Sequence, residues 1–193
     1  MDSKKAVIQN MLEQNTANMI FYEDSFVKTT FFTKEIQNWE IPIFYFDFDL
    51  QYTGFVKSET TPKTKNLTLL SPENGNLHEN LKSVIGQISK KRSLIIIDSL
   101  NGFFNVLEGN KDVGRLVNSF LMLLVTCARH TKSTVILGIL SKLNEENKWV
   151  LYNTGRSLID NIHFTKIQLA KKENNIFAKL LSSDNLSNSD LIL

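Results

Sequence analysis

Short apolar runs alternate with amphipathic segments along most of this chain. The apolar positions of residues 1–15 recur at helical spacing, and segments 28–39, 76–90 and 112–130 show the same periodicity. Between these segments lie continuous runs of β-branched, aromatic and aliphatic residues, a pattern typical of strands that are buried on both faces. These runs are 18–22, 41–48, 67–70, 93–97 and 134–140.

This alternation predicts an α/β fold with a mostly parallel central sheet flanked by helices. Two further segments, 162–171 and 175–181, flank Lys172-Glu173-Asn174 and predict a closing C-terminal β-hairpin. With only three prolines and eight glycines, the chain shows no linker between domains. We therefore expect one domain over 1–183, beginning with helix 1–15, and a frayed tail rich in Ser, Asn and Asp over 184–193.

Composition and charge narrow the class of protein. A chain of 193 residues with 42% hydrophobic and 22% charged residues is large enough to bury a core. Its net charge of +2 argues against a strongly basic nucleic-acid module. The single cysteine, Cys127, excludes an intramolecular disulfide and a multi-cysteine metal site. The charged start and the short apolar run Phe120–Val125 predict no signal peptide and no membrane span, so we expect a cytoplasmic protein.

The junction after the first strand partly matches a phosphate-binding loop, G-x-x-x-x-G-K-[ST]. Lys28 and Thr29, followed by Thr30, stand where the lysine and threonine of that motif belong. Tyr22 and Val27 replace its two glycines, which let backbone N–H groups close around phosphate oxygens. Lys28, Thr29 and Thr30 are therefore candidate phosphate-binding residues, and the alternative interpretation is a polar start of a helix.

Carboxylates follow two other strands. Asp47 and Asp49 come after the second strand, where they could orient a water molecule or a metal ion, or be solvated loop acids. Asp98 closes the run Leu94–Ile97 and precedes Ser99, which is a Walker B pattern whose aspartate holds Mg²⁺ in P-loop enzymes. An aspartate in such a place can also simply cap the next turn.

Taken in order, these pieces resemble the RecA-like ATPase core in its RadA/KaiC-like branch, from about residue 18 to 183. The resemblance implies that Lys28 holds phosphate and that Thr29 and Asp98 hold Mg²⁺. It also implies that Asp49 stands where the family typically has the glutamate that activates water. Leu140 falls near the place of the γ-phosphate sensor, which is therefore missing. The missing glycines, glutamate and sensor favour a chain that is not an enzyme.

Three functions remain open. The first is a non-hydrolysing RecA-like (pseudo-ATPase) subunit that acts by protein–protein assembly or regulation, with no cofactor. Inactive RecA-like subunits occur in larger rings, such as the Elongator accessory ring and recombinase paralogue complexes. The second is a weak or partner-completed ATPase that uses ATP and Mg²⁺, with Asp49 as the catalytic candidate. The third is a nucleic-acid module, for which the basic cluster Lys90–Arg92 is one candidate surface, although nucleic acid is not expected to bind the isolated chain.

We favour the first function. It implies that protein partners, or further copies of this chain, bind along the RecA-like edges of the domain, and we expect no contact with a membrane. It predicts that Lys28→Ala leaves stability and function nearly unchanged. The aromatic candidates for an exposed interface are Phe55, Phe103 and Phe104, together with Phe44 and Tyr45, which lie in a strand and are more often core residues.

Overall fold

The computed structural model describes residues 2–60, 64–73, 75–143, 149–151, 164–172, 175–181 and 190–192. The helices are α1 (Asp2–Gln14), α2 (Ser25–Ile36), α3 (Gln51–Lys57), α4 (Leu77–Ile88), α5 (Leu100–Val106) and α6 (Val113–His130). The strands are β1 (Ala17–Tyr22), β2 (Ile43–Asp47), β3 (Leu67–Leu70), β4 (Leu94–Asp98), β5 (Thr134–Leu143), β6 (Trp149–Leu151), β7 (Phe164–Lys172), β8 (Asn175–Leu181) and β9 (Asp190–Ile192).

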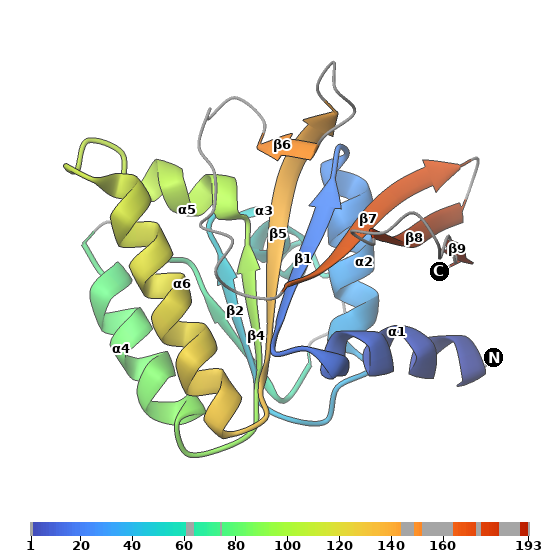
Figure 1. Ribbon diagram of the computed structural model, residues 1–193, viewed down its shortest axis with the longest axis horizontal. Coiled ribbons are helices and arrows are strands. Elements are labelled where there is room, and N and C mark those ends of the chain that lie inside the picture. Colours follow the sequence, from blue (N-terminus) through green and yellow to red (C-terminus); the bar gives the residue numbers. More distant parts are fainter. Residues whose placement is uncertain are drawn as a thin grey trace.

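One sheet runs through the molecule in the strand order β3-β2-β4-β5-β1-β7-β8-β9, and β6 pairs with β5 (Figure 1). Neighbouring strands from β3 to β7 pair in parallel, whereas β8 and β9 are antiparallel to their neighbours. The predicted α/β class, the mostly parallel sheet and the closing hairpin, here β7–β8, are thereby confirmed. Within the tail expected to fray, Asp190–Ile192 forms β9, and the rest of 182–193 lies outside the described residues.

Alternate residues of the central strands belong to two hydrophobic cores, one on each side of the sheet. Phe44, Phe46, Ile95 and Ile97 pack with residues of α4, α5 and α6, while Tyr45 and Ile96 pack with residues of α1, α2 and α3. Figure 1 shows these two helical layers with the sheet between them. Because both faces are covered, the strands read as unbroken apolar runs in the sequence.

The helix boundaries differ from the predicted ones where it matters for the site. Helix α2 begins at Ser25, three residues before the predicted start at Lys28. The seven-residue helices α3 and α5 were not predicted. In α5, five residues from Leu100 to Phe104 are buried, so no polar face marks it as a helix. Both short helices begin within a few residues of a strand end, which places them beside the candidate site.

No helix of the described residues combines the length and the apolar character needed to cross a membrane.

Candidate functional site

The junction between β1 and α2 is a tight turn with only Glu23 and Asp24 between the strand and the helix. Asp24 caps the helix: its backbone is extended, and its Oδ1 accepts a hydrogen bond of 2.7 Å from the Phe26 N–H. The Lys28 N–H already donates to the Asp24 carbonyl at 3.2 Å as part of the helix. A carboxylate of the chain itself therefore binds at the helix terminus, where a bound phosphate would otherwise lie.

Tyr22 and Val27, which replace the two glycines of the motif, are both buried in the core that α1 and α2 cover. Their side chains fill the space at the end of β1 with apolar atoms. Burial raises the pKa of the Tyr22 hydroxyl far above its ordinary value, so that it stays protonated. The predicted phosphate loop is in this structure a packed turn with no open cradle of N–H groups.

Lys28 points from α2 into the carboxyl edge of the sheet. Its side chain has no solvent exposure, and its Nζ lies 2.7 Å from Asp98 Oδ1 and 3.7 Å from Asp49 Oδ2. The Tyr22 ring lies on another side of the ammonium, with its centroid 5.3 Å from Nζ. Lys28 and Asp98, 70 residues apart in sequence, thus form a buried ion pair.

Asp98 uses both of its carboxylate oxygens within the protein. Oδ1 faces Lys28, and Oδ2 accepts a hydrogen bond from the Tyr45 hydroxyl. Burial raises the pKa of Asp98 to about 6, although Lys28 and the Tyr45 hydrogen bond act to lower it. The peptide bond between Asp98 and Ser99 is cis. Tyr45, a strand residue we had interpreted as core or interface, is the partner that sequence reasoning missed.

The two carboxylates after β2 have different surroundings. Asp47 is fully buried, accepts a 2.6 Å hydrogen bond from the Thr53 N–H at Oδ2, and has its pKa raised by burial. Asp49 is 28% exposed, which makes it the most accessible carboxylate of the group around Lys28. Helix α5 packs against this turn so closely that a Cβ on Gly102 would meet Asp49 Oδ1 at 2.4 Å.

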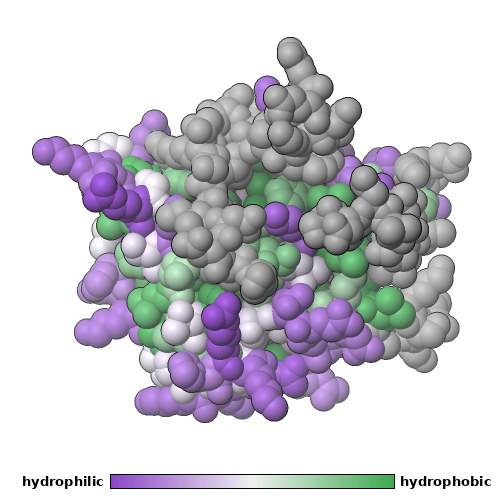
Figure 2. Space-filling view, in the orientation of Figure 1, coloured by the Kyte–Doolittle hydropathy of each residue, from purple (hydrophilic) through white to green (hydrophobic). Residues whose placement is uncertain are grey.

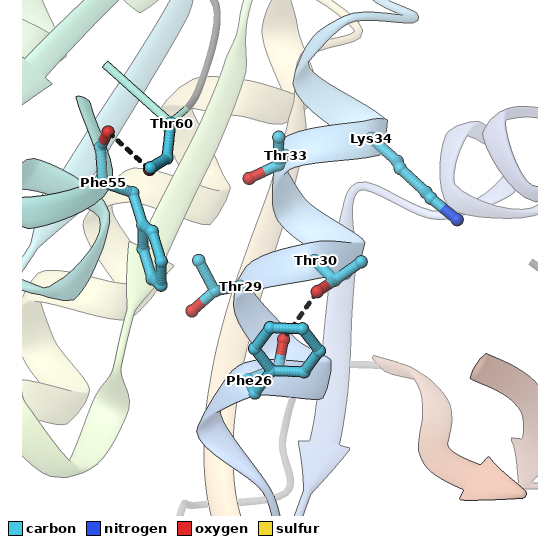
Figure 3. Close-up of a pocket in the computed structure, with 7 residues that line it drawn as sticks. All are labelled: Phe26, Thr29, Thr30, Thr33, Lys34, Phe55 and Thr60. Atoms are coloured by element: carbon cyan, nitrogen blue, oxygen red, sulfur yellow. Dashed lines mark hydrogen bonds between the residues drawn. The ribbon is translucent and has the colours of Figure 1, made fainter. Parts of the chain in front are cut away.

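Thr29 is buried and Thr30 is half-buried on α2. Their hydroxyls donate to the Ser25 carbonyl at 2.8 Å and to the Phe26 carbonyl at 2.9 Å. Both residues line a cavity of about 260 Å³ beside α2, and the Thr29 side chain points across it towards Phe55 (Figure 3). The structure therefore brings Lys28, Asp49 and Asp98 together and places Thr29 and Thr30 around a separate surface cavity.

The backbone N–H of Leu140, the residue that the resemblance aligns with a γ-phosphate sensor, is also hydrogen-bonded. Its N–H donates a 3.0 Å hydrogen bond to Oδ1 of Asn101, a residue of α5. Because α5 was not predicted, no sequence signal pointed to this contact. This hydrogen bond links β5 to α5.

The aromatic candidates for an interface are mostly buried: the core alternative is confirmed for Phe44 and Tyr45, and the interface interpretation is wrong for Phe103 and Phe104. Phe44, Tyr45, Phe103 and Phe104 lie in the two cores, and only Phe55 is half-buried. The large apolar side chains that are exposed near the candidate site are Phe26, at 59%, and Leu50, at 57%. They follow β1 and β2, respectively.

The groups that Mg²⁺-ATP would contact are bound to one another in this arrangement. A magnesium ion would need Asp98, whose oxygens are held by Lys28 and Tyr45, and a phosphate would need Lys28 and the α2 terminus. Among the side chains that the structure describes, no group of three or more His, Cys, Asp or Glu is arranged to hold a metal ion. Lys28 and Asp98 pair with each other, and the buried Asp47 accepts a hydrogen bond from the Thr53 N–H.

No protein-family model matches the chain, and no curated protein is significantly similar to it.

Proposed function

We propose that this chain is a non-hydrolysing, RecA-like subunit that acts through protein–protein contacts in a larger assembly. The observation that carries the proposal is the buried ion pair between Lys28 and Asp98, 2.7 Å apart. In the family that the sequence resembles, these two groups would hold the phosphate and the Mg²⁺ of the nucleotide. Here each is the partner of the other, and Asp24 caps the helix that would face the phosphate.

The exposed residues around the pair support assembly as the role of this edge. Phe26, in the first turn of α2, and Leu50, in the turn before α3, present apolar side chains to solvent. Leu50 has a positive φ of 58°, a conformation that is uncommon for a bulky residue. Strained positions of this kind gather at functional surfaces. A DNA-repair or RNA-modification complex is the type of assembly that the resemblance suggests.

The alternative is a weak ATPase that a partner completes. The accessibility of Asp49 favours this alternative, since a partially exposed carboxylate can orient a water molecule. It requires the Lys28–Asp98 pair to open and Asp24 to leave the helix terminus. Opening would expose two charges that now neutralise each other in a buried site, which is costly unless a ligand replaces both contacts.

Hydrolysis separates the two functions. The assay uses about 50 µM protein, in excess over radiolabelled ATP and with Mg²⁺ present. We expect the protein to release phosphate from ATP no faster than buffer alone does. The matched control is Lys28→Met/Asp98→Leu, which removes both charges together and keeps the volume of the pair. Phosphate release by the wild type that is absent from this double variant would contradict the proposal and establish the alternative.

A further inference from the structure

The end of the sheet opposite the candidate site carries a concentration of positive charge. Two turns meet there: residues 89–93, between α4 and β4, and residues 129–133, which comprise the last two residues of α6 and the turn before β5 (Figure 1). Of these ten residues, five are Lys or Arg and none is Asp or Glu. The sequence singled out only Lys90–Arg92, and the fold brings Arg129, His130 and Lys132 beside them.

Hydrogen bonds fix the two turns against each other. Arg92 Nε donates to the Lys132 carbonyl at 3.1 Å, and the Thr131 hydroxyl donates to the Ile88 carbonyl at 2.9 Å. The Ser93 N–H donates to Ser133 Oγ at 2.9 Å. The charged side chains therefore project from a single rigid surface, which we call the basic pole and define as Lys90, Lys91, Arg92, Arg129, His130 and Lys132.

Most of this charge is uncompensated within the described residues. Arg92 pairs with Glu13 of α1 at 3.1 Å. Lys90, Lys91, Arg129 and Lys132 are exposed, and the structure gives them no ion pair with any described residue. The lower edge of the space-filling view is accordingly hydrophilic (Figure 2). Four exposed cations on one surface attract a polyanion.

We propose that the basic pole binds the phosphodiester backbone of a nucleic acid, without reading its sequence. Lys and Arg are the side chains that contact backbone phosphates, and both are present here. Neither turn exposes a large apolar residue, which disfavours a hydrophobic protein partner or insertion into a lipid surface. Trp39, the aromatic residue of the neighbouring turn before β2, is buried, so the pole offers no platform for base stacking.

This surface lies at the amino ends of the strands, away from Lys28 and Asp98, and does not depend on the proposed function. A scaffold subunit with the basic pole would present its apolar edge to protein partners and its opposite end to nucleic acid. Four phosphate contacts give a slope of about −3.5 in log K against log salt concentration, or about 100-fold weaker binding at 200 mM than at 50 mM salt.

The test is fluorescence anisotropy of the full chain with 20-base-pair labelled duplexes of DNA and of RNA, at several salt concentrations. We expect the dissociation constant of the wild type to rise with salt concentration. The double variant Lys90→Gln/Lys132→Gln should raise the dissociation constant about tenfold at 50 mM salt, and its slope of log K against log salt concentration should be smaller by about 2. The control Lys57→Gln/Lys111→Gln changes net charge equally at exposed positions outside the pole and should bind as the wild type does.

Three results would overturn the proposal. They are the absence of any anisotropy change up to about 100 µM protein at 50 mM salt, equal losses in the two double variants, and binding to phosphatidylserine vesicles but not to either duplex. The last result would assign the basic pole to an anionic membrane surface instead.

Discussion

At the scale of single residues, the central feature is a lysine that is buried with its countercharges. Lys28 has no exposed surface and lies between Asp98 and Asp49. Breaking a buried pair by removing one partner leaves an uncompensated charge, whereas replacing both with apolar residues is often neutral. The expectation that Lys28→Ala leaves stability nearly unchanged treated Lys28 as a solvated remnant of a loop, and its burial beside Asp98 leads us to revise that expectation.

We predict that Lys28→Ala lowers the free energy of unfolding by about 3–5 kcal/mol, since Asp98 loses its partner and a cavity opens. Lys28→Met/Asp98→Leu should fall within about 2 kcal/mol of the wild type. Urea denaturation of the three proteins at pH 7 measures both values. A single variant as stable as the wild type would mean that water already reaches Asp98.

The titration of Asp98 predicts a pH dependence. Its pKa rises from 3.8 in the unfolded chain to about 6 in the folded protein, so the folded state binds a proton more tightly. The contribution of Asp98 to stability is therefore fully present below about pH 4 and is lost as the pH rises through 6, by about 3 kcal/mol. The difference in unfolding free energy between wild type and Asp98→Asn, measured from pH 4 to 7, should fall accordingly. A flat difference would show that Lys28 keeps Asp98 ionised throughout.

At the scale of elements, the contact between the β2–α3 turn and α5 shapes the site. Gly102 lets α5 approach Phe48 and Asp49, because a Cβ there would meet Phe48 Cβ at 2.8 Å as well as Asp49 Oδ1. Three residues before it, Ser99 caps the helix by accepting the Gly102 N–H at 3.1 Å. The position of Asp49 beside Lys28 thus depends on a helix that the sequence did not reveal.

We predict that Gly102→Ala lowers the free energy of unfolding by about 1–3 kcal/mol, because the turn must move to admit the methyl group. Gly86→Ala is the matched control: it lies within α4, a Cβ there has no neighbour within 4 Å, and alanine should stabilise the helix by about 0.5–1 kcal/mol. Thermal unfolding of both variants gives the comparison. Similar shifts in the same direction would contradict the close approach of α5.

At the scale of the whole molecule, the sequence predicted what local patterning determines. The central apolar runs became strands within a few residues of the expected bounds, because burial on both faces leaves a continuous signal. The sequence did not predict the ion pair between Lys28 and Asp98 or the basic pole. Both join segments that are 40 or more residues apart, and their meeting depends on strand order and on how the turns are packed.

The resulting molecule has two ends with different chemistry. At the carboxyl ends of the strands, Lys28 is enclosed by carboxylates and flanked by the exposed apolar residues Phe26 and Leu50. At the amino ends, cations gather with few acids. This polarity is what the proposed adaptor between a protein assembly and a polyanion would require.

The most direct test of this account is isothermal titration calorimetry of the purified chain with Mg²⁺-ATP, up to about 5 mM nucleotide. We predict no binding heat, and the same result for Lys28→Met/Asp98→Leu, since Lys28 and Asp98 already hold each other. Binding at micromolar affinity that the double variant loses would contradict the account. It would mean that the nucleotide opens the buried pair and that the chain is a working member of the ATPase family it resembles.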